Sequence, residues 1–183
     1  MDARVIRTRR DLSYAFLSLL DTKDYDSIKV IDICKQAMIS KVTFYNNFKN
    51  KNELLNHILL VFEESIKKDI FEASANFKTK KDMILAIVKI SYKNILKNSS
   101  TLKKILSTKS TSGVLIDLRN FINNEILRHI ESLQSDEKSS IPKDYFAAFY
   151  SGAIVSILPM VLSAYEHGES PLDEDSLIKL FTS

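Results

Sequence analysis

The chain contains little glycine, proline or cysteine: three, three and one among 183 residues. So few glycines and prolines disfavour a protein built from hairpins and many tight turns. The single cysteine, Cys34, excludes an intrachain disulfide framework and is typical of a reducing cytoplasm. Because hydrophobic residues make up 45% of the chain and charged residues 27%, we expect a soluble cytoplasmic protein with an all-α fold.

The sequence also lacks the motifs of several classes of enzyme and metal site, which restricts the functions that we expect. No glycine-rich loop is present to hold a nucleotide phosphate, and no spacing predicts an acyl-transfer triad. His57, His129 and His167 are scattered, and no cysteine or acidic residue gives them a metal-ligand spacing. Cys34 lies on an apolar helix face and is interpreted as a small core residue rather than a redox sensor. The sequence therefore predicts no enzyme, no cofactor and no metal site. It also predicts no signal peptide, because the first amphipathic segment begins with arginines.

Hydrophobic residues recur at helical spacing along most of the chain and predict about nine helices. These cover residues 8–20, 30–37, a short segment after 40, 51–75, 80–97, 102–106, 112–133, 142–167 and 173–181. Thr8 with Asp11, and Asn50 with Glu53, look like capping pairs at the starts of the first and fourth helices. A loop is expected at 134–140, and Gly168 is expected to close the eighth helix.

One stretch, residues 145–165, carries no charge and is long enough in principle to cross a bilayer. Its serines, its small residues and the central Pro159 differ from a typical membrane span, and no basic cluster follows it. A helix that is apolar on every side can equally be buried in a soluble protein. We therefore interpret this stretch as a buried core or dimer helix, kinked at Pro159, and keep a membrane anchor as the alternative.

Residues 30–54 are the most informative part of the sequence. They predict two short helices joined by a tight turn, with a third helix beginning after them, which is the layout of a helix-turn-helix. Ile33, Ala37, Ile39, Phe44 and Phe48 supply a compact apolar core for it. In such a motif the second helix enters the major groove of DNA. The alternative is an ordinary helical hairpin with a solvated polar face. In the preceding loop, Tyr25 and Ile28 are expected to reach the core.

The second helix of this motif exposes polar side chains suited to base edges: Lys41, Thr43, Asn46 and Asn47. Lysine and asparagine pair with guanine and adenine, and a threonine methyl can contact thymine. Tyr45 and Lys51 are better placed for phosphates. The whole excess of positive charge lies in residues 1–60, as attraction to phosphates requires.

Several of these residues together resemble the DNA-binding signature of TetR-type transcriptional regulators. The resemblance covers residues 8–60 and is carried by Ala37, Ile39-Ser40-Lys41, Thr43-Phe44-Tyr45, Phe48 and Lys51 with Glu53-Leu54-Leu55. It implies that Lys41 and Thr43 lie at base edges, with Asn46 and Asn47 nearby. It further implies that Ser40, Tyr45 and Lys51 hold phosphates, together with Thr8, Arg9 and Arg10 at the start of the first helix.

Two positions depart from the family. Met38 stands in the turn where glycine is usual, which implies mild strain or a different turn geometry. Val42 stands where a small residue is common, so the base preference at this position is open. The string Thr-Phe-Tyr-Asn-Asn-Phe, with the later Tyr-Ser-Gly-Ala-Ile, looks like the branch that includes regulators of dihydroxyacetone kinase. Some members of that branch activate transcription with a partner protein.

The sequence thus predicts a DNA-binding domain at residues 1–50 and a helical effector-binding and dimerisation domain at 51–183. We expect a homodimer on a near-palindromic operator in double-stranded DNA, and a ligand-responsive repressor whose effector pocket is unknown. The dimer contact is expected from helices 112–133 and 142–167, at Leu118, Ile122, Phe149, Gly152, Ala153 and Ser156. Seven aromatic residues are candidates for a pocket or for plain core: Phe71, Phe77, Tyr92, Phe121, Phe146, Phe149 and Tyr150. The alternative function is a co-regulator or activator whose C-terminal domain binds a partner protein.

Overall fold

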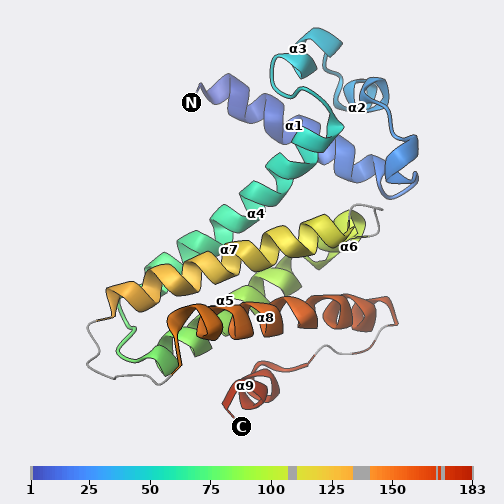
Figure 1. Cartoon of the computed structure of the whole chain (residues 1–183). Coiled ribbons are helices and arrows are strands. Elements are labelled where there is room, and N and C mark those ends of the chain that lie inside the picture. Colours follow the sequence, from blue (N-terminus) through green and yellow to red (C-terminus); the bar gives the residue numbers. More distant parts are fainter. Residues whose placement is uncertain (1, 107–110, 134–140, 168, 170–171, 183) are drawn as a thin grey trace. The chain divides into compact units, whose positions relative to one another are not determined.

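The computed structural model describes residues 2–106, 111–133, 141–167, 169 and 172–182. Within these residues the chain forms nine α-helices and one 3-10 turn (η1), without a strand, so the predicted all-α fold is confirmed (Figure 1). The elements are α1 (Ala3–Leu19), η1 (Tyr25–Ser27), α2 (Val30–Ala37), α3 (Lys41–Tyr45), α4 (Lys51–Ser74), α5 (Lys80–Lys97), α6 (Ser99–Leu106), α7 (Thr111–Ser132), α8 (Lys143–Glu166) and α9 (Glu174–Thr182). The predicted loop at 134–140 and the predicted closing residue Gly168 lie outside the described residues.

The helices divide into two compact units. The first unit comprises Met1–Phe62 with Ser100–Thr111, and the second comprises Glu63–Ser99 with Ser112–Ser183. Helix α4 is continuous and contributes its first half to one unit and its second half to the other. The helix-turn-helix segment therefore lies wholly within the first unit.

The first unit encloses a small apolar core to which each of its helices contributes. Leu12 and Phe16 from α1, Ile33 from α2 and Phe44 from α3 are completely buried. In addition, Tyr25 and Ile28 are buried, so the predicted attachment of the loop to the core is confirmed. This core fixes the positions of α2 and α3.

Helix α1 begins five residues earlier than the sequence pattern predicts. Its N-cap is Asp2, whose carboxylate accepts a hydrogen bond of 2.9 Å from the backbone N–H of Arg4. Thr8 and Asp11 therefore lie inside the helix, and the predicted capping pair at the helix start is wrong. The pattern misled because none of residues 3–7 is buried and the buried face of α1 begins only at Leu12, whereas an N-cap aspartate allows the helix to extend into solvent.

The capping pair predicted for α4 is present. The side-chain oxygen of Asn50 accepts a hydrogen bond of 2.9 Å from the backbone N–H of Glu53. The Glu53 carboxylate accepts from the backbone N–H of Lys49, one residue before the position expected for a capping box. The start of α4 is therefore fixed directly after α3.

In the second unit, α5 contacts both α8 and α9 (Figure 1). Helix α8 is not buried on every side. Ala147, Ser151, Ile154 and Leu158, at spacings of three and four, are buried on one face. Tyr145, Phe149 and Met160 are exposed on another. By length and composition α8 could also cross a membrane, although one of its faces is packed in this unit.

Two residues predicted at a dimer interface lie instead in the core of the second unit. Leu118 and Ile122 of α7 are 3% and 4% exposed, in line with the buried Val114 and Ile126. The four residues recur every four positions and so form one inward face of α7. The sequence could not show which apolar face of α7 a neighbouring helix covers, because Ile116 and Leu115 also suggest a second stripe.

Candidate DNA interface

The turn between α2 and α3 has the geometry of a helix-turn-helix that lacks its usual glycine. Met38 has φ 55° and ψ 39°, the left-handed conformation, and is the sole non-glycine residue with positive φ among the described residues. Its side chain is 94% exposed. Of the two interpretations left open by the sequence, the left-handed turn geometry is therefore kept, a conformation that favours glycine.

Helix α3 begins at a well-formed cap. The Ser40 hydroxyl accepts a hydrogen bond of 3.0 Å from the backbone N–H of Thr43, and the two side-chain oxygens lie 2.9 Å apart. Phe44 is completely buried and anchors the helix from below. A five-residue helix has too few internal hydrogen bonds to be stable alone, so the cap and this anchor hold it in place.

The four residues predicted to read bases differ in how available they are. Lys41 and Asn46 are exposed, whereas Thr43 and Asn47 are half-buried. The Asn47 side-chain amide donates a hydrogen bond of 2.9 Å to the carbonyl of Thr43, which fixes its orientation. In this arrangement Lys41 and Asn46 present free polar ends, and Asn47 closes the last turn of α3.

One exposed residue on the same helix was not among the predicted contacts. Val42 is 71% exposed at the second position of α3, next to Lys41. An exposed aliphatic side chain on a recognition helix is suited to the methyl group of thymine. The sequence had left the base preference at Val42 open, and the exposure of its side chain shows that it is available for such a contact.

The predicted phosphate contacts form two groups. Tyr45 is exposed at the end of α3, with its ring edge-to-face against buried Phe44 at 5.5 Å. On α1, Thr8 and Arg9 are half-buried and Arg10 is exposed, where Arg10 pairs with Asp11 at 3.0 Å. These surface groups have the chemistry of backbone contacts that fix register without reading sequence.

Arg9 has unusual surroundings within the first unit. Its guanidinium lies 5.4 Å from the centre of the Phe48 ring, a cation–π contact. Its Nε atom is buried and has no hydrogen-bond partner. The Phe48 ring in turn packs at 5.3 Å against His57 of α4. Burial, and secondarily the charge of Arg9, lower the pKa of His57. The aromatic pair thus holds the arginine stem at the surface of the core.

Lys51 differs from the other predicted phosphate contacts because its ammonium is directed into the first unit. It donates to backbone carbonyls of η1 and the residue after it, at 2.6 Å for Tyr25 and 2.9 Å for Ile28. A phosphate would have to compete with these partners.

Cys34 is buried on α2, and burial raises the pKa of its thiol. This favours the protonated, unreactive form and agrees with a core role. Among the described residues, no group of three or more His, Cys, Asp or Glu side chains is placed to hold a metal ion.

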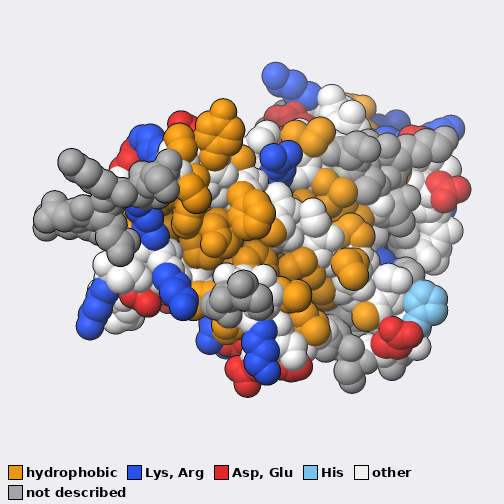
Figure 2. Space-filling view, turned by 60° about the horizontal axis from the view of Figure 1, so that its bottom comes forward, with side chains coloured by type: hydrophobic (Ala, Val, Ile, Leu, Met, Phe, Trp, Pro, Cys, Tyr) orange, Lys and Arg blue, Asp and Glu red, His pale blue; other side chains and the backbone are white. Residues whose placement is uncertain are grey.

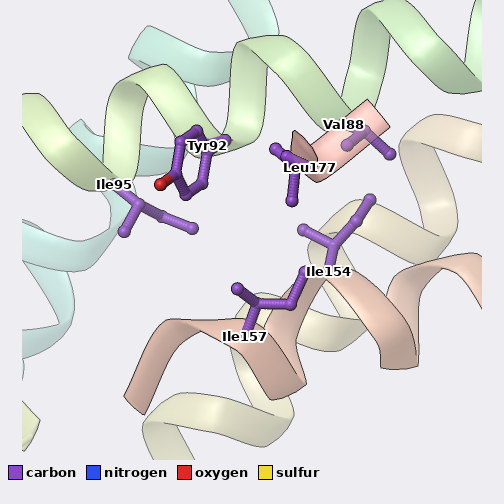
Figure 3. Close-up of a pocket in the computed structure, with 6 residues that line it drawn as sticks. All are labelled: Val88, Tyr92, Ile95, Ile154, Ile157 and Leu177. Carbon is purple, nitrogen blue, oxygen red and sulfur yellow. The ribbon is translucent and has the colours of Figure 1, made fainter. Parts of the chain in front are cut away.

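The second unit contains a very small apolar pocket. A cavity of about 10 Å³ lies between α5, α8 and α9 (Figure 3). Its lining is Val88, Tyr92, Ile95, Ile154, Ile157 and Leu177. Such a volume is near the lower limit for one water molecule, and the lining is apolar. The Tyr92 hydroxyl donates to the backbone carbonyl of Leu172, just before α9.

A larger, open groove lies between α8 and α9. Its volume is about 390 Å³, and it is lined by Phe149, Tyr150, Ala153, Ile157, Leu180 and Phe181. Figure 2 shows hydrophobic side chains gathered on the face that it displays. Of the seven predicted aromatic candidates, Tyr92 lines the cavity, Phe149 and Tyr150 line the groove, and Phe71 is exposed on α4.

Comparison with known proteins supports the identity of the first unit. Residues 15–58 match the model of the family described as bacterial regulatory proteins, tetR family. The HTH-type transcriptional regulator YxbF of Bacillus subtilis is 43% identical over 60 residues, which are 32% of this chain and 16% of that protein. The dhaKLM operon transcriptional activator DhaS of Lactococcus lactis is 33% identical over 82 residues, 45% of this chain and 42% of that protein. The matches thus span less than half of these curated relatives.

Solved structures share the fold over nearly the whole chain. A TetR-family regulator from Syntrophomonas wolfei has a TM-score of 0.74 at 17% identity, with 95% of this chain and 90% of that chain covered. The dihydroxyacetone kinase operon activator DhaS has a TM-score of 0.60 at 24% identity, with 97% and 91% covered.

These findings confirm the predicted resemblance: residues 15–58, which hold the helix-turn-helix, match the tetR family of bacterial regulatory proteins, and the chain shares its fold with a solved TetR-family regulator. The sequence match to DhaS further supports the branch that includes regulators of dihydroxyacetone kinase.

Proposed function

We propose that this regulator binds a near-palindromic operator as a homodimer and that residues 1–50 perform the reading. The observation that carries the proposal is α3, whose exposed face combines Lys41, Val42 and Asn46 while Phe44 anchors it. Lys41 and Asn46 supply donors for base edges, and Val42 supplies an apolar contact. Thr8, Arg9, Arg10, Ser40 and Tyr45 supply backbone contacts.

The dimer contact is proposed on the exposed face of α8. Phe149 and Ser156 are exposed, and Gly152 and Ala153 lie between them. A methyl group added at Gly152 would meet nothing nearer than Arg119 Nε, at 3.9 Å. The absence of a larger side chain there leaves room for a second helix to approach closely. Residues 51–183 would then supply both dimerisation and control.

Control by a small molecule would use the second unit. The cavity beneath α9 is too small for an effector as it stands, so binding would require displacement of Leu177, which fills its α9 side. An apolar effector fits the lining. Regulation requires that the effector bind the DNA-competent and DNA-incompetent arrangements with different affinity. Repression by such a protein is the simplest form of this control.

A second candidate is favoured by the similarity to DhaS, whose printed description is that of an operon activator. In this alternative the second unit binds a partner protein and the regulator activates transcription. The open apolar groove between α8 and α9 would be available to such a partner. Both candidates share the same DNA-reading unit in a cytoplasmic protein without catalytic activity.

The test is selection of bound sequences from a random double-stranded DNA library with the full chain, at two salt concentrations. We expect enrichment of a palindrome with half-sites separated by one or more helical turns. Tyr45→Ala and Asn46→Ala should abolish enrichment. Lys35→Ala, which removes an exposed lysine from the end of α2, is the matched control and should leave it intact.

The result also separates the two candidates. An operator bound tightly by the protein alone supports the homodimeric reader, and a reporter gene then gives the sign of regulation. Sequence-blind binding that disappears at the higher salt concentration would overturn it. Recovery of specific binding only after a candidate partner protein is added would support the second candidate.

A further inference from the structure

Lys51 is the first residue of α4, yet its side chain forms hydrogen bonds with a different segment of the chain. The ammonium donates hydrogen bonds to the carbonyl oxygens of Tyr25 at 2.6 Å, Ile28 at 2.9 Å and Asp26 at 3.4 Å. It also lies 4.4 Å from the centre of the Tyr25 ring. An ammonium has three donors, so the three carbonyls can engage all of them, and the ring adds a cation–π contact.

The positive charge of Lys51 is unfavourable at the N-terminus of the helix that carries it. A cation at the N-terminus of a helix opposes the helix dipole, and an acidic or small polar residue is the usual choice there. The carbonyl oxygens at the end of η1 carry the complementary partial charge and compensate for it. The lysine is therefore suited to this contact and poorly suited to the helix that carries it.

Tyr25 extends the contact to the rest of the first unit. Its ring is buried and packs edge-to-face against Phe16 of α1, with centroids 6.0 Å apart. Its hydroxyl is hydrogen-bonded to the side-chain oxygen of Asn52, the residue after Lys51. Two consecutive residues of α4 thus hold one tyrosine of η1. We call the contacts of Lys51 and Asn52 with residues 25–28 the Lys51 clasp.

The clasp joins the two ends of the helix-turn-helix. Between Ile28 and Lys51 the chain contains α2, the Met38 turn and α3, and nothing else of regular structure. A contact between the ends of a segment removes conformational freedom from everything inside it. The orientation of α3 relative to α4 is fixed at this base as well as by the core beneath Phe44.

We propose that Lys51 is a positioning residue for the recognition helix and not a phosphate ligand. The inference rests on the proposed DNA-reading function, since positioning is judged by what α3 binds. Lys51 touches no base in this role. It keeps α3 at the angle at which Lys41, Val42 and Asn46 meet a base edge together.

The test compares Lys51→Met with Lys51→Arg in the full chain. Affinity is measured for the selected operator and for a random duplex, over a series of salt concentrations. Loss of the clasp should weaken operator binding by about tenfold or more, because the arrangement of α3 that binds would then be only fractionally populated in the free protein. Random-duplex affinity and the salt slope should stay at the wild-type values. Lys51→Arg should be impaired as well, because a planar guanidinium cannot direct three N–H groups at three converging carbonyls.

A phosphate ligand predicts the opposite pattern. Lys51→Met would then reduce the slope of log K against log salt by about 0.9 and weaken operator and random DNA equally. Lys51→Arg would bind normally. Either of these results would overturn the proposal. Equal operator affinities of the Lys51→Met and Lys49→Met proteins would overturn it as well. That control removes one lysine charge from an exposed position two residues earlier.

A measurement without DNA separates this inference from the proposed function. Amide hydrogen exchange of α2 and α3 should accelerate in Lys51→Met while that of α5 stays unchanged. Tyr25→Leu, which keeps the core apolar but removes the ring, should accelerate the same amides, and the double variant should show less than the summed effect. Unchanged amide exchange in α2 and α3 would refute the positioning role of the Lys51 clasp even if no operator is found. Faster exchange without any operator would leave the clasp standing and refute the DNA-reading function alone.

Discussion

The backbone N–H of Ile39 donates a hydrogen bond of 2.9 Å to the carbonyl of Cys34, across the left-handed Met38. Met38 N–H donates at 3.2 Å to Lys35. These two bonds form a Schellman motif, the usual way to end a helix when glycine follows it. Here methionine takes the glycine position, and the turn between α2 and α3 keeps its geometry at a conformational cost.

Replacing Met38 by glycine should remove the conformational cost of the left-handed turn. Met38→Gly should raise the free energy of unfolding relative to Met38→Ala by about 1 kcal/mol, because only glycine adopts positive φ without strain. The methionine side chain is 94% exposed, so little packing is lost in either variant. Urea unfolding followed by circular dichroism checks the difference. Equal stability of the two variants would show that the turn is unstrained.

Leu177 should carry most of the packing energy of α9. It is 1% exposed against the cavity between α5 and α8. Leu177→Ala should lower the free energy of unfolding by about 2–4 kcal/mol through lost burial and an enlarged cavity. Leu180→Ala on the same helix is the matched control, since Leu180 is 66% exposed and should change stability by less than about 0.5 kcal/mol. Similar losses in both would mean that α9 is held mainly at its N-terminal end, through Lys89–Glu174 and the Tyr92 hydrogen bond to Leu172.

Phe149 should be required for self-association. Phe149→Glu places a charge on the proposed dimer face and should weaken the dimer by about 2 kcal/mol or more, roughly 30-fold. Phe71→Glu is a close control, because Phe71 is a phenylalanine of the same unit with 70% exposure against 69% for Phe149. Light scattering across a concentration series gives the masses. Dissociation by Phe71→Glu and not by Phe149→Glu would move the interface from α8 to α4.

The first unit should lose stability in mild acid because of His57. Burial lowers the pKa of His57 in the folded protein below its ordinary value of 6.5. The unfolded chain therefore binds a proton at a higher pH than the folded one, and stability falls as pH decreases through and below 6.5. His57→Gln should flatten this part of the profile. His167→Gln alters an exposed histidine of the second unit and should leave the profile as it is. The free energy of unfolding, measured by chemical denaturation across this pH range, tests the prediction. If His57→Gln keeps the wild-type pH profile, the loss of stability in acid comes from other groups.

Much of this protein could be predicted from local sequence patterns. Helices α2 and α5 have the predicted bounds, and α4, α7, α8 and α9 differ from prediction by at most one residue at either end. Helical periodicity and caps such as Ser40 and Asn50 act within a few residues of each other, so a sequence records them directly. The family resemblance has the same origin, because the helix-turn-helix is one short contiguous segment.

Other properties depended on partners far away in the chain. The sequence showed that Lys51 is a cation at the start of α4, but the carbonyls that receive its ammonium lie more than twenty residues earlier. It showed that α7 has apolar residues, but only packing in the second unit decided that Leu118 and Ile122 face inward. It showed a helix without charges at 145–165, but only packing decided which of its faces stays exposed.

The sequence by itself therefore determined the helices, the helix-turn-helix and the family resemblance of that segment, since these follow from hydrogen bonds and side-chain spacing between near neighbours. Tertiary structure decided what each side chain is available to do. Burial and coordination depend on which distant groups fold against a residue, and a charge such as that of Lys51 can meet either a phosphate or a carbonyl until the fold supplies one of them.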